Sequence, residues 1–302
     1  MIRQTTVRAV RVVQTLRAAR ALVPAPGRIA RATPRRVYST VNPTSLSAFN
    51  SNHSTYDKYR PTFDPSAVDS LLDELRLPAG ATVVDLASGT GKFTALLADK
   101  GFDLSAVEVS EGMLTTFREN YPTIPAFQGS SYEIPFADNS VDAVFAAQAF
   151  HWFANDRALT EIHRVLKPGG RLVLVWNFDP EDSHAADWQR QVANTAWAYI
   201  GDLPQYRDFG WTSAFDSTPE LATQFRLPVS EAKHYWAYKT PKEAVWPLWH
   251  SKSYITVLPE DEKAKVKARI EDIVAAAPAS ETDADGLLTI RMGVHFVWTE
   301  KL

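Results

Sequence analysis

Two glycines and two acids lie close together around the segment VVDLASGTGKFT, residues 83–94. Gly89 and Gly91 follow an apolar run, where glycine lets the backbone approach a ligand and adopt positive φ. A helix that begins after such a turn offers unpaired N–H groups to the same ligand. Glu108 comes 17 residues after Gly91, at the end of the next apolar run, where a carboxylate can accept both hydroxyls of a ribose. The spacing therefore predicts a site for a nucleoside derivative.

Two further residues discriminate between the candidate classes of nucleoside cofactor. A nicotinamide dinucleotide would favour a third glycine three residues after Gly91, where helix and pyrophosphate crowd the turn, but Thr94 stands there. Asp85, inside the first apolar run, suits a ligand with a cationic end better than one with a pyrophosphate. In the alternative interpretation, Asp85 only caps the turn and the glycines form a tight connection.

The elements that must position these residues follow from the apolar pattern. Strands are expected at residues 82–87, 104–109, 126–130, 141–150 and 171–178, and helices at 65–77, 93–101, 112–120 and 157–166. The strands are too apolar to face water on either side. The alternation predicts an α/β fold with a parallel sheet that helices cover on both faces.

A long segment, residues 179–286, separates these elements from the end of the chain. It contains six of the nine tryptophans and several helical patterns, and it is far longer than a crossover connection. We expect a helical substrate cap at 179–286, inserted into a cofactor-binding core at 41–178. Residues 287–302 are expected to complete the core sheet as an antiparallel pair of strands that turns near Met292 and Gly293.

The first 38 residues carry nine arginines and no acidic residue. Arginines interleaved with apolar residues suit a basic amphipathic helix, which is typical of mitochondrial transit peptides. RVYST, residues 36–40, also resembles a matrix-processing site. We therefore expect residues 1–40 to be a mitochondrial targeting segment outside the fold. The alternatives are a disordered basic arm or a start codon placed too far upstream, in which case the protein would be cytoplasmic.

The composition excludes several kinds of site. The chain has no cysteine, which rules out disulfides, thiolate nucleophiles and cysteine-based zinc sites. No apolar run approaches the roughly 18 residues of an integral membrane span. The seven histidines show no H-E-x-x-H spacing, so no catalytic metal is expected. Beyond the arginine-rich arm the chain is acidic and carries no basic stripe for a nucleic acid. The sequence gives no signal for the oligomeric state.

Together these motifs resemble those of class I S-adenosylmethionine-dependent methyltransferases, in the type 11 branch that includes ubiquinone-biosynthesis and trans-aconitate methyltransferase-like enzymes. VVDLASGTGKFT resembles the first family motif, with Ala87 where a glycine is usual, and AVEVSEGML, residues 106–114, resembles the second. The segments 129–153 and 161–178 resemble later blocks, and YDKYRPTFD, residues 56–64, resembles the segment before the core. The resemblance implies a Rossmann-like, seven-stranded sheet with an antiparallel last strand, an inserted helical cap, and S-adenosylmethionine as cofactor.

The resemblance also implies which residues bind the cofactor. Glu108 takes the ribose position, and Met113 is expected to line the adenine. Family members often have an aspartate where this chain has Ser130, so the adenine contact is expected to pass to Ser131, Tyr132 or the backbone. Arg60 would pair with the methionine carboxylate or an acidic substrate, or else anchor its segment to the core. The full expected set is Tyr59, Arg60, Asp85, Ala87, Ser88, Gly89, Gly91, Glu108, Val109, Met113, Ser131, Tyr132 and Gln148.

Methyl transfer from a sulfonium is an in-line displacement, so the protein mainly aligns two molecules and excludes water. A hydroxyl or an acidic carbon must also lose a proton, whereas a carboxylate is already ionised. His151, just beyond the fourth expected strand, is the candidate base, and the alternative is that His151 and Trp152 only shape the pocket wall. The segment HSKSYITV, residues 250–257, is expected to face the acceptor.

The sequence favours a small-molecule methyl acceptor, with a carboxylate or hydroxyl as the accepting group. The tryptophan-rich cap counts against a protein or RNA methyltransferase. A non-catalytic S-adenosylmethionine-binding or assembly protein is the other alternative, because no obligatory catalytic residue exists whose loss would reveal it.

Overall fold

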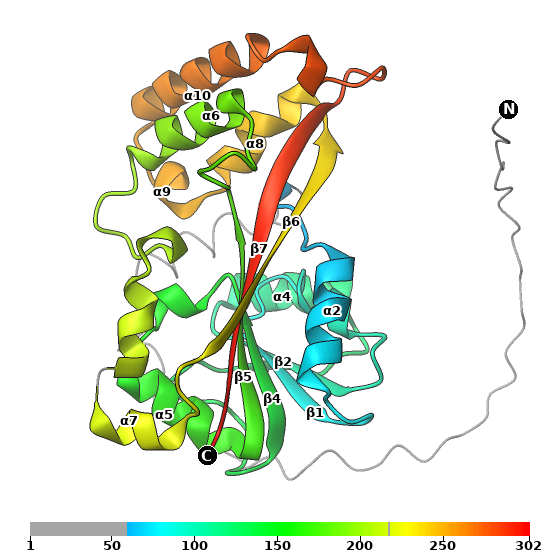
Figure 1. Ribbon diagram of the computed structural model, residues 1–302, viewed down its shortest axis with the longest axis vertical. Helices are drawn as coiled ribbons and strands as arrows, with labels where there is room; N and C mark the ends of the chain where they lie inside the picture. Colours follow the sequence, from blue (N-terminus) through cyan, green and yellow to red (C-terminus); the bar gives the residue numbers. More distant parts are fainter. Residues whose placement is uncertain (1–58, 217) are drawn as a thin grey trace, which may run out of the picture.

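The computed structural model describes residues 59–216 and 218–302, and the strands of this part of the chain form one seven-stranded sheet (Figure 1). The strands follow the order β3-β2-β1-β4-β5-β7-β6. The first five pair in parallel, and β7 runs antiparallel to both of its neighbours. This confirms the expected fold class. The strands are β1 (Thr82–Leu86), β2 (Asp103–Glu108), β3 (Ala126–Gln128), β4 (Val141–Ala147), β5 (Leu166–Phe178), β6 (Ser230–Thr240) and β7 (Leu288–Glu300).

Local sequence signals explain where the core helices begin. Asp64 caps the first one and accepts a bond from the Ser66 N–H, with Pro65 at its first position. Ser110 and Asn155 cap two others in the same way. Figure 1 shows α2 and α5 on opposite faces of the sheet. The core helices are α2 (Pro65–Leu75), α3 (Thr94–Leu97), α4 (Glu111–Asn120) and α5 (Asp156–Val165). The 3-10 turn η2 (Phe150–Trp152) lies between β4 and α5.

The cap helices pack around a hydrophobic cluster of their own, at the end of the molecule that the long strands β6 and β7 reach (Figure 1). Helices α6 and α10 contribute Val192 and Ile270, and α8 contributes Trp249. The cap is therefore a packed unit joined to the core through the sheet. Apart from β6, the elements between β5 and β7 are α6 (Asp187–Trp197), η3 (Tyr206–Asp208), η4 (Gly210–Asp216), α7 (Pro219–Gln224), η5 (Lys242–Ala244), α8 (Val245–His250), α9 (Ser253–Thr256), α10 (Glu260–Ala275) and η6 (Ala279–Glu281). Of these, η4 and α7 pack against the core cluster around α5 instead, through Trp211, Phe215 and Leu221.

The prediction of two antiparallel strands at residues 287–302 is wrong. Residues 288–300 form the single strand β7, and its hairpin-like partner is β6, which lies in the segment expected to be a helical cap. Gly293 does not turn the chain, because it pairs with Phe178 across the ladder and a Cβ there would overlap the Phe178 ring. Strand β6 escaped notice because it is an edge strand whose residues are exposed or half-buried, so it lacks an apolar run.

Other expectations hold to within a few residues, except that α3 covers only Thr94–Leu97 of the expected helix at 93–101. The targeting segment at 1–40 and the residues before Tyr59 lie outside the described residues. Among the described residues, no helix has both the length and the apolarity that crossing a membrane requires. The division into a core at 41–178 and a cap at 179–286 stays a prediction.

Candidate functional site

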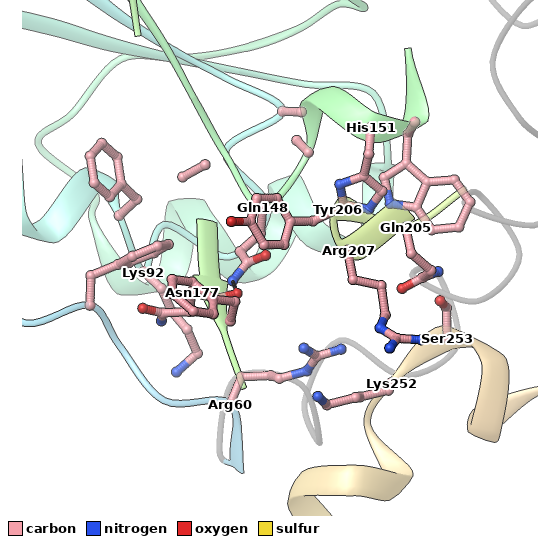
Figure 2. Close-up of a pocket in the computed structure, with 18 of the residues that line it drawn as sticks. Arg60, Lys92, Gln148, His151, Asn177, Gln205, Tyr206, Arg207, Lys252 and Ser253 are labelled. Atoms are coloured by element: carbon pink, nitrogen blue, oxygen red, sulfur yellow. Dashed lines mark hydrogen bonds between the residues drawn. The ribbon is translucent and has the colours of Figure 1, made fainter. Parts of the chain in front are cut away.

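A cavity of about 550 Å³ opens at the carboxyl ends of β1, β2, β4 and β5, and the cap closes its far side (Figure 2). The order of the strands reverses between β1 and β4, because β2 and β3 lie on one side of β1, and β4 and β5 lie on the other. Open α/β sheets bind ligands at such a switch point. The predicted residues that line the cavity are Arg60, Ala87, Ser88, Gly89, Glu108, Val109, Met113, Ser131, Tyr132, Gln148 and His151. Tyr59, Asp85 and Gly91 are not among the lining residues.

The two glycines of the turn have different roles. Both have positive φ, +59° at Gly89 and +93° at Gly91. A Cβ at Gly89 would meet only the Met113 sulfur, at 3.9 Å, so this backbone is open to the cavity. A Cβ at Gly91 would overlap the ring of Tyr121, the residue that follows α4. Gly89 therefore leaves room for a ligand, whereas Gly91 leaves room for the packing of α4 against the turn.

Glu108 ends β2 with its carboxylate buried at the cavity wall. Its Oε2 accepts the Gly89 N–H at 2.9 Å, and its Oε1 accepts the Ser110 N–H at 2.7 Å. Burial raises the pKa of Glu108, and the backbone donors oppose that rise. Each carboxylate oxygen has a second lone pair, so both can still accept a hydroxyl of a ligand.

Asp85 lies inside β1, fully buried beneath the turn. Its Oδ2 accepts the Thr94 hydroxyl at 2.5 Å, which gives a structural reason for threonine at this position. Its Oδ1 has no hydrogen-bond partner among the described residues. Burial raises the pKa of Asp85 to about 7, and the nearby charge of Glu108 adds to the rise while the Thr94 hydrogen bond opposes it.

Two residues at neighbouring strand ends have left-handed backbone. Ala87 follows β1 with φ +57°, and Gln148 follows β4 with φ +56°. The Gln148 side chain donates to the Asn177 carbonyl at 2.9 Å, and both residues line the cavity. Such outliers cost of order 1–3 kcal/mol and gather at ligand sites. Glycine adopts this left-handed conformation more easily than other residues. Ala87 adopts it nevertheless, so the turn keeps the backbone path that the usual glycine would give.

The expected adenine side is lined by Met113, Ser131 and Tyr132. The Tyr132 hydroxyl accepts the Asn155 amide at 2.9 Å, and Arg157 stacks over its ring at 4.9 Å. Ser130, in place of the family aspartate, also lines the cavity and accepts the Tyr132 N–H at 3.2 Å. This wall offers an apolar face with hydroxyls beside it.

The chain's own residues fit S-adenosylmethionine. The Ser88 hydroxyl lines the cavity and is buried without a hydrogen-bond partner among the described residues. The Asp85 Oδ1 beneath it is also without one. Buried polar groups are seldom left unpaired, so these atoms favour a polar, partly cationic ligand above the turn.

His151 lies in η2 and lines the cavity. The Trp176 indole N–H donates to its Nδ1 at 3.2 Å. An indole nitrogen can only donate, so Nδ1 is unprotonated and the proton of the neutral ring is on Nε2. Burial, followed by the charge of Arg60, lowers the pKa of His151 to about 3. His151 is thus a hydrogen-bond donor whose basic nitrogen is already occupied, which favours the pocket-wall interpretation.

Three cations meet at the cap side of the cavity, where Figure 2 shows Arg60, Arg207 and Lys252 pointing toward one another. Lys252 pairs with Asp179 at 2.6 Å, and its side chain is only 13% exposed. Arg207 pairs with Glu181 at 3.2 Å. Burial lowers the pKa of Lys252, Asp179 raises it, and the charges of Arg60 and Arg207 lower it further. The carboxylates of Asp179, Glu181 and Asp182 also line the cavity, so this side of it is strongly charged.

Arg60 also joins the start of the described chain to the cap. Its Nε donates to the Ser251 hydroxyl at 2.8 Å, and its Nη2 donates to the Ser251 carbonyl at 3.4 Å. Ser251 directly follows α8. The anchoring partner of Arg60 thus lies in the cap, and its guanidinium still faces the cavity.

Sequence reasoning missed most of the cap side. Lys252, Ser253 and Tyr254 belong to the segment 250–257, which was expected to face the acceptor, and all three line the cavity. No spacing pointed to Arg207, or to its neighbour Tyr206, which bonds to the buried His295 of β7. Among residues 59–216 and 218–302, no three His, Cys, Asp or Glu side chains gather as metal ligands would.

The chain is similar in sequence to known proteins. A family model described as "Methyltransferase domain" matches residues 84–174. An uncharacterized methyltransferase of Mycobacterium bovis is 38% identical over 77% of this chain and 87% of its own length. An uncharacterized methyltransferase-like protein of Schizosaccharomyces pombe is 33% identical over 77% of this chain and 88% of its own. A malonyl-[acyl-carrier protein] O-methyltransferase of Methylococcus capsulatus is 40% identical, over 35% of this chain and 42% of its own.

The fold is likewise shared with solved structures. A putative type II methyltransferase of Anaeromyxobacter dehalogenans superposes with a TM-score of 0.54, at 22% identity, over 80% of this chain and 97% of its own. The matched family model begins inside β1 and ends inside β5, so it spans the strands that build the glycine turn and the Glu108 wall. Since two relatives above 30% identity also cover more than three quarters of the chain, the chain belongs to the class I S-adenosylmethionine-dependent methyltransferases.

Proposed function

We propose that this methyltransferase acts on a small acceptor that carries an anionic group and accepts the methyl on oxygen. The observation that carries the proposal is the continuity of the cavity, which runs from Gly89 and Glu108 at the sheet to Arg207 and Lys252 at the cap. Its volume of about 550 Å³ lies in the range of small-molecule sites. A macromolecular acceptor would need an open groove instead.

The cofactor end is formed by the turn and the adjacent wall. Glu108 would accept the ribose hydroxyls, with Met113 and Tyr132 against the adenine. When bound, S-adenosylmethionine supplies a methyl group on a positively charged sulfur. The residues around it align the acceptor, and the cap excludes water from the reacting atoms. Arg60 is placed to meet either the methionine carboxylate or the acceptor's anion.

The acceptor end offers hydrogen-bond donors for an anion. Arg207 and Lys252 line the cavity, and each has further N–H groups that can donate charge-assisted hydrogen bonds to an anionic group besides those that face Glu181 and Asp179. The relative from Methylococcus capsulatus is an O-methyltransferase by name, which supports oxygen as the accepting atom. The protein or RNA methyltransferase and the non-catalytic binding protein are the competing functions.

Calorimetric titration of the full chain with S-adenosylmethionine, S-adenosylhomocysteine and NADH tests the cofactor end. We expect the first two to bind and NADH not to bind. Methyl transfer to a panel of small hydroxy acids and carboxylic acids, each beside its neutral amide, tests the acceptor end. Acids should be methylated in preference to amides. A preference for neutral acceptors, or for protein or RNA, would contradict the proposal.

A paired variant sharpens the test of the cation cluster. Lys252→Met combined with Asp179→Asn removes the pair without leaving an unpaired buried charge. The KM for an acid should rise about tenfold, the cost of one charge-assisted hydrogen bond. The KM for S-adenosylmethionine should stay unchanged. Lys265→Met, on the exposed face of α10, is the matched control.

We also propose that residues 1–40 direct the protein to mitochondria, which rests on their arginine content and lack of acids. A fluorescent protein fused behind residues 1–40 should enter mitochondria, and the same fusion with the arginines replaced by glutamine should not. Cytosolic fluorescence from the unaltered fusion would favour the alternative of a basic arm.

A further inference from the structure

We propose that Tyr206 and His295 form a proton relay that takes the acceptor's hydroxyl proton, with Glu231 as the counter-charge of His295 at the surface, and that the accepting atom is therefore a hydroxyl oxygen. The inference rests on the proposed function, because it requires a small acceptor in the cavity. It adds a residue that takes the acceptor's proton, and it chooses the hydroxyl over the carboxylate as accepting group.

The three residues form a continuous chain of hydrogen bonds. Tyr206 of η3 lines the cavity (Figure 2), and its hydroxyl lies 2.8 Å from Nδ1 of His295. His295 of β7 is fully buried, and its Nε2 lies 2.9 Å from Oε2 of Glu231 on β6. The Glu231 side chain is 64% exposed. The chain thus begins at the cavity and ends at solvent, through segments that are far apart in sequence.

The chemistry of the partners fixes the direction of each hydrogen bond. An ionised carboxylate can only accept, so Nε2 of His295 carries the proton that Glu231 accepts. In the neutral ring Nδ1 then has no proton and accepts the Tyr206 O–H. The phenol oxygen of Tyr206 keeps its lone pairs for a donor. A protic group of the acceptor is such a donor.

The surroundings of His295 and Tyr206 keep both side chains neutral while no acceptor is bound. Burial lowers the pKa of His295, Glu231 opposes this, and Lys233 of β6 adds to it. Burial raises the pKa of the Tyr206 hydroxyl, and the charges of Glu231 and Tyr235 raise it further. The rings of Trp176 and Trp211 flank His295 from β5 and η4, each with its centroid 6.3 Å from the imidazole. The imidazole is therefore neutral before an acceptor binds, with its unprotonated Nδ1 next to the Tyr206 hydroxyl.

In the proposed step, proton transfer from the acceptor is coupled to methyl transfer. The acceptor's hydroxyl proton moves to the Tyr206 oxygen while the Tyr206 proton moves to Nδ1 of His295. The freed oxygen pair forms the bond to the methyl carbon as the carbon–sulfur bond breaks, and the sulfonium becomes a neutral thioether. Glu231 stabilises the imidazolium with its negative charge. After the product leaves, the Nδ1 proton returns to Tyr206 as water that enters the cavity takes the proton that Tyr206 received from the acceptor.

His151 does not offer the same route. Its unprotonated nitrogen already accepts the Trp176 indole N–H, which cannot receive a proton in exchange. A buried histidine on the inner face of β7 is also costly as a mere packing residue, since burying an imidazole is less favourable than burying a leucine. The relay gives a use for both of its nitrogens.

The probe for the test is 4-nitrophenol, whose phenolate absorbs visible light. It is titrated against the full chain saturated with S-adenosylhomocysteine, and the ionised fraction of the bound probe is followed against pH. In the natural protein the bound probe should ionise at lower pH than in water. His295→Gln keeps an amide that donates and accepts hydrogen bonds but cannot take up a proton, so at neutral pH the ionised fraction should fall by about tenfold.

Two variants and a control separate a relay from a structural role. Tyr206→Phe should remove the ionisation, and Glu231→Gln should shift its pH profile upward, because the imidazolium loses its counter-charge. His163→Gln on α5 should change nothing. All variants should keep their affinity for S-adenosylhomocysteine, which checks the fold and the cofactor end separately.

Turnover gives a second readout with 4-hydroxyphenylacetate, which carries both a hydroxyl and a carboxylate. The ether should be the product, and His295→Gln should lower kcat by about a hundredfold with little change in KM. Formation of the ester instead, an un-ionised bound probe, or no binding of 4-nitrophenol at millimolar concentration would overturn the relay. If S-adenosylhomocysteine itself failed to bind, the proposed function would fail instead.

Discussion

At the scale of single residues, Glu108 and Asp85, the two acids next to the glycine turn, differ in their hydrogen bonds. Glu108 accepts two backbone N–H groups and lines the cavity, so it is held in one orientation before a ligand binds. Asp85 lies beneath the wall with one oxygen unpaired among the described residues. Glu108 is thus held at the cavity wall, whereas Asp85 is a buried carboxyl group outside the cavity lining.

Replacing Glu108 by alanine should weaken S-adenosylmethionine binding by about 1–3 kcal/mol, the usual cost of losing charged hydrogen bonds. Calorimetric titration measures the change. Glu119→Ala, on the exposed side of α4, serves as the control. An unchanged affinity in a folded Glu108→Ala protein would show that the ribose lies elsewhere.

Asp85 makes the ligand-free protein sensitive to pH. Its pKa is about 7 in the folded state and 3.8 in the unfolded chain, so between these values the folded state binds more protons. Stability from this group is therefore full at acid pH and falls as pH rises toward 7. Asp85→Asn should lack this fall, and its free energy of unfolding relative to the natural protein should rise by up to ~4 kcal/mol over that range.

Urea unfolding of the ligand-free proteins at about pH 4 and about pH 8 measures the difference. Asp99→Asn, an exposed replacement close by, controls for the loss of one charge. A difference between Asp85→Asn and the natural protein that does not change with pH would show that Asp85 is ionised throughout.

The sequence could predict the residues that one local motif brings together. Gly89 and Glu108 were predicted because their spacing reports a turn and the next strand end. Arg207 and His295 were not, and Lys252 was predicted only as part of the segment 250–257, because these residues meet only after the cap folds over the sheet. No short-range spacing relates a residue of η3 to one of β7, so a relay or a charge cluster of this kind requires the tertiary structure.

At the scale of elements, β5 and β7 approach each other closely where Phe178 faces Gly293. A Cβ on Gly293 would overlap the Phe178 ring, so the two strands can pair there only if one residue lacks a side chain. The glycine therefore fixes the register of the last strand against the sheet. Its role is packing, although its sequence context suggested a turn.

Gly293→Ala should destabilise the protein by about 1–3 kcal/mol, because Phe178 must leave its position. Phe178→Leu in the same chain should recover part of the loss, which a double-mutant cycle on urea unfolding would show. Gly210→Ala is the matched control, since a Cβ there meets nothing within 4 Å. Equal losses in both glycine variants would mean that chain entropy, and not the ring, sets the cost.

Element by element, the parallel strands were predictable because each is an apolar run that is buried on both faces. Strand β6 was not, since an exposed edge strand has no such run. The cap helices α6 and α10 were predictable from their periodicity, whereas the 3-10 turns η3 and η4 were not. Those turns place Tyr206 and Trp211, so the undetected elements are the ones that build the relay.

At the scale of the whole molecule, β7 joins all three hydrophobic clusters. Leu288 belongs to the cap cluster, Val294 to the cluster under α2, and Val297 to the cluster under α5. Lys301, just beyond the strand, donates to Asn139, to the carbonyl of His163 and to the carbonyl of Leu166, at 2.7–2.8 Å. Core and cap are therefore expected to unfold together.

Lys301→Met should lower the free energy of unfolding by about 1–3 kcal/mol, because it leaves buried carbonyls at the end of α5 unpaired. Tryptophan fluorescence, to which Trp188 and Trp197 of α6 and Trp246 and Trp249 of α8 contribute, and far-ultraviolet circular dichroism should shift by the same amount. Lys267→Met on α10 controls for the charge. Two separate transitions would show that the cap unfolds on its own.

The position of β7 also affects how the protein is made. Ribosomes extend the chain from its N-terminus, so β5 is complete more than a hundred residues before its neighbour β7 emerges. Until then one side of β5 is an open strand edge, the kind of surface that pairs with other chains. A nascent chain stalled before residue 288 would therefore be a natural client for chaperones, and this edge of the sheet can close only after residues 288–300 have been synthesised.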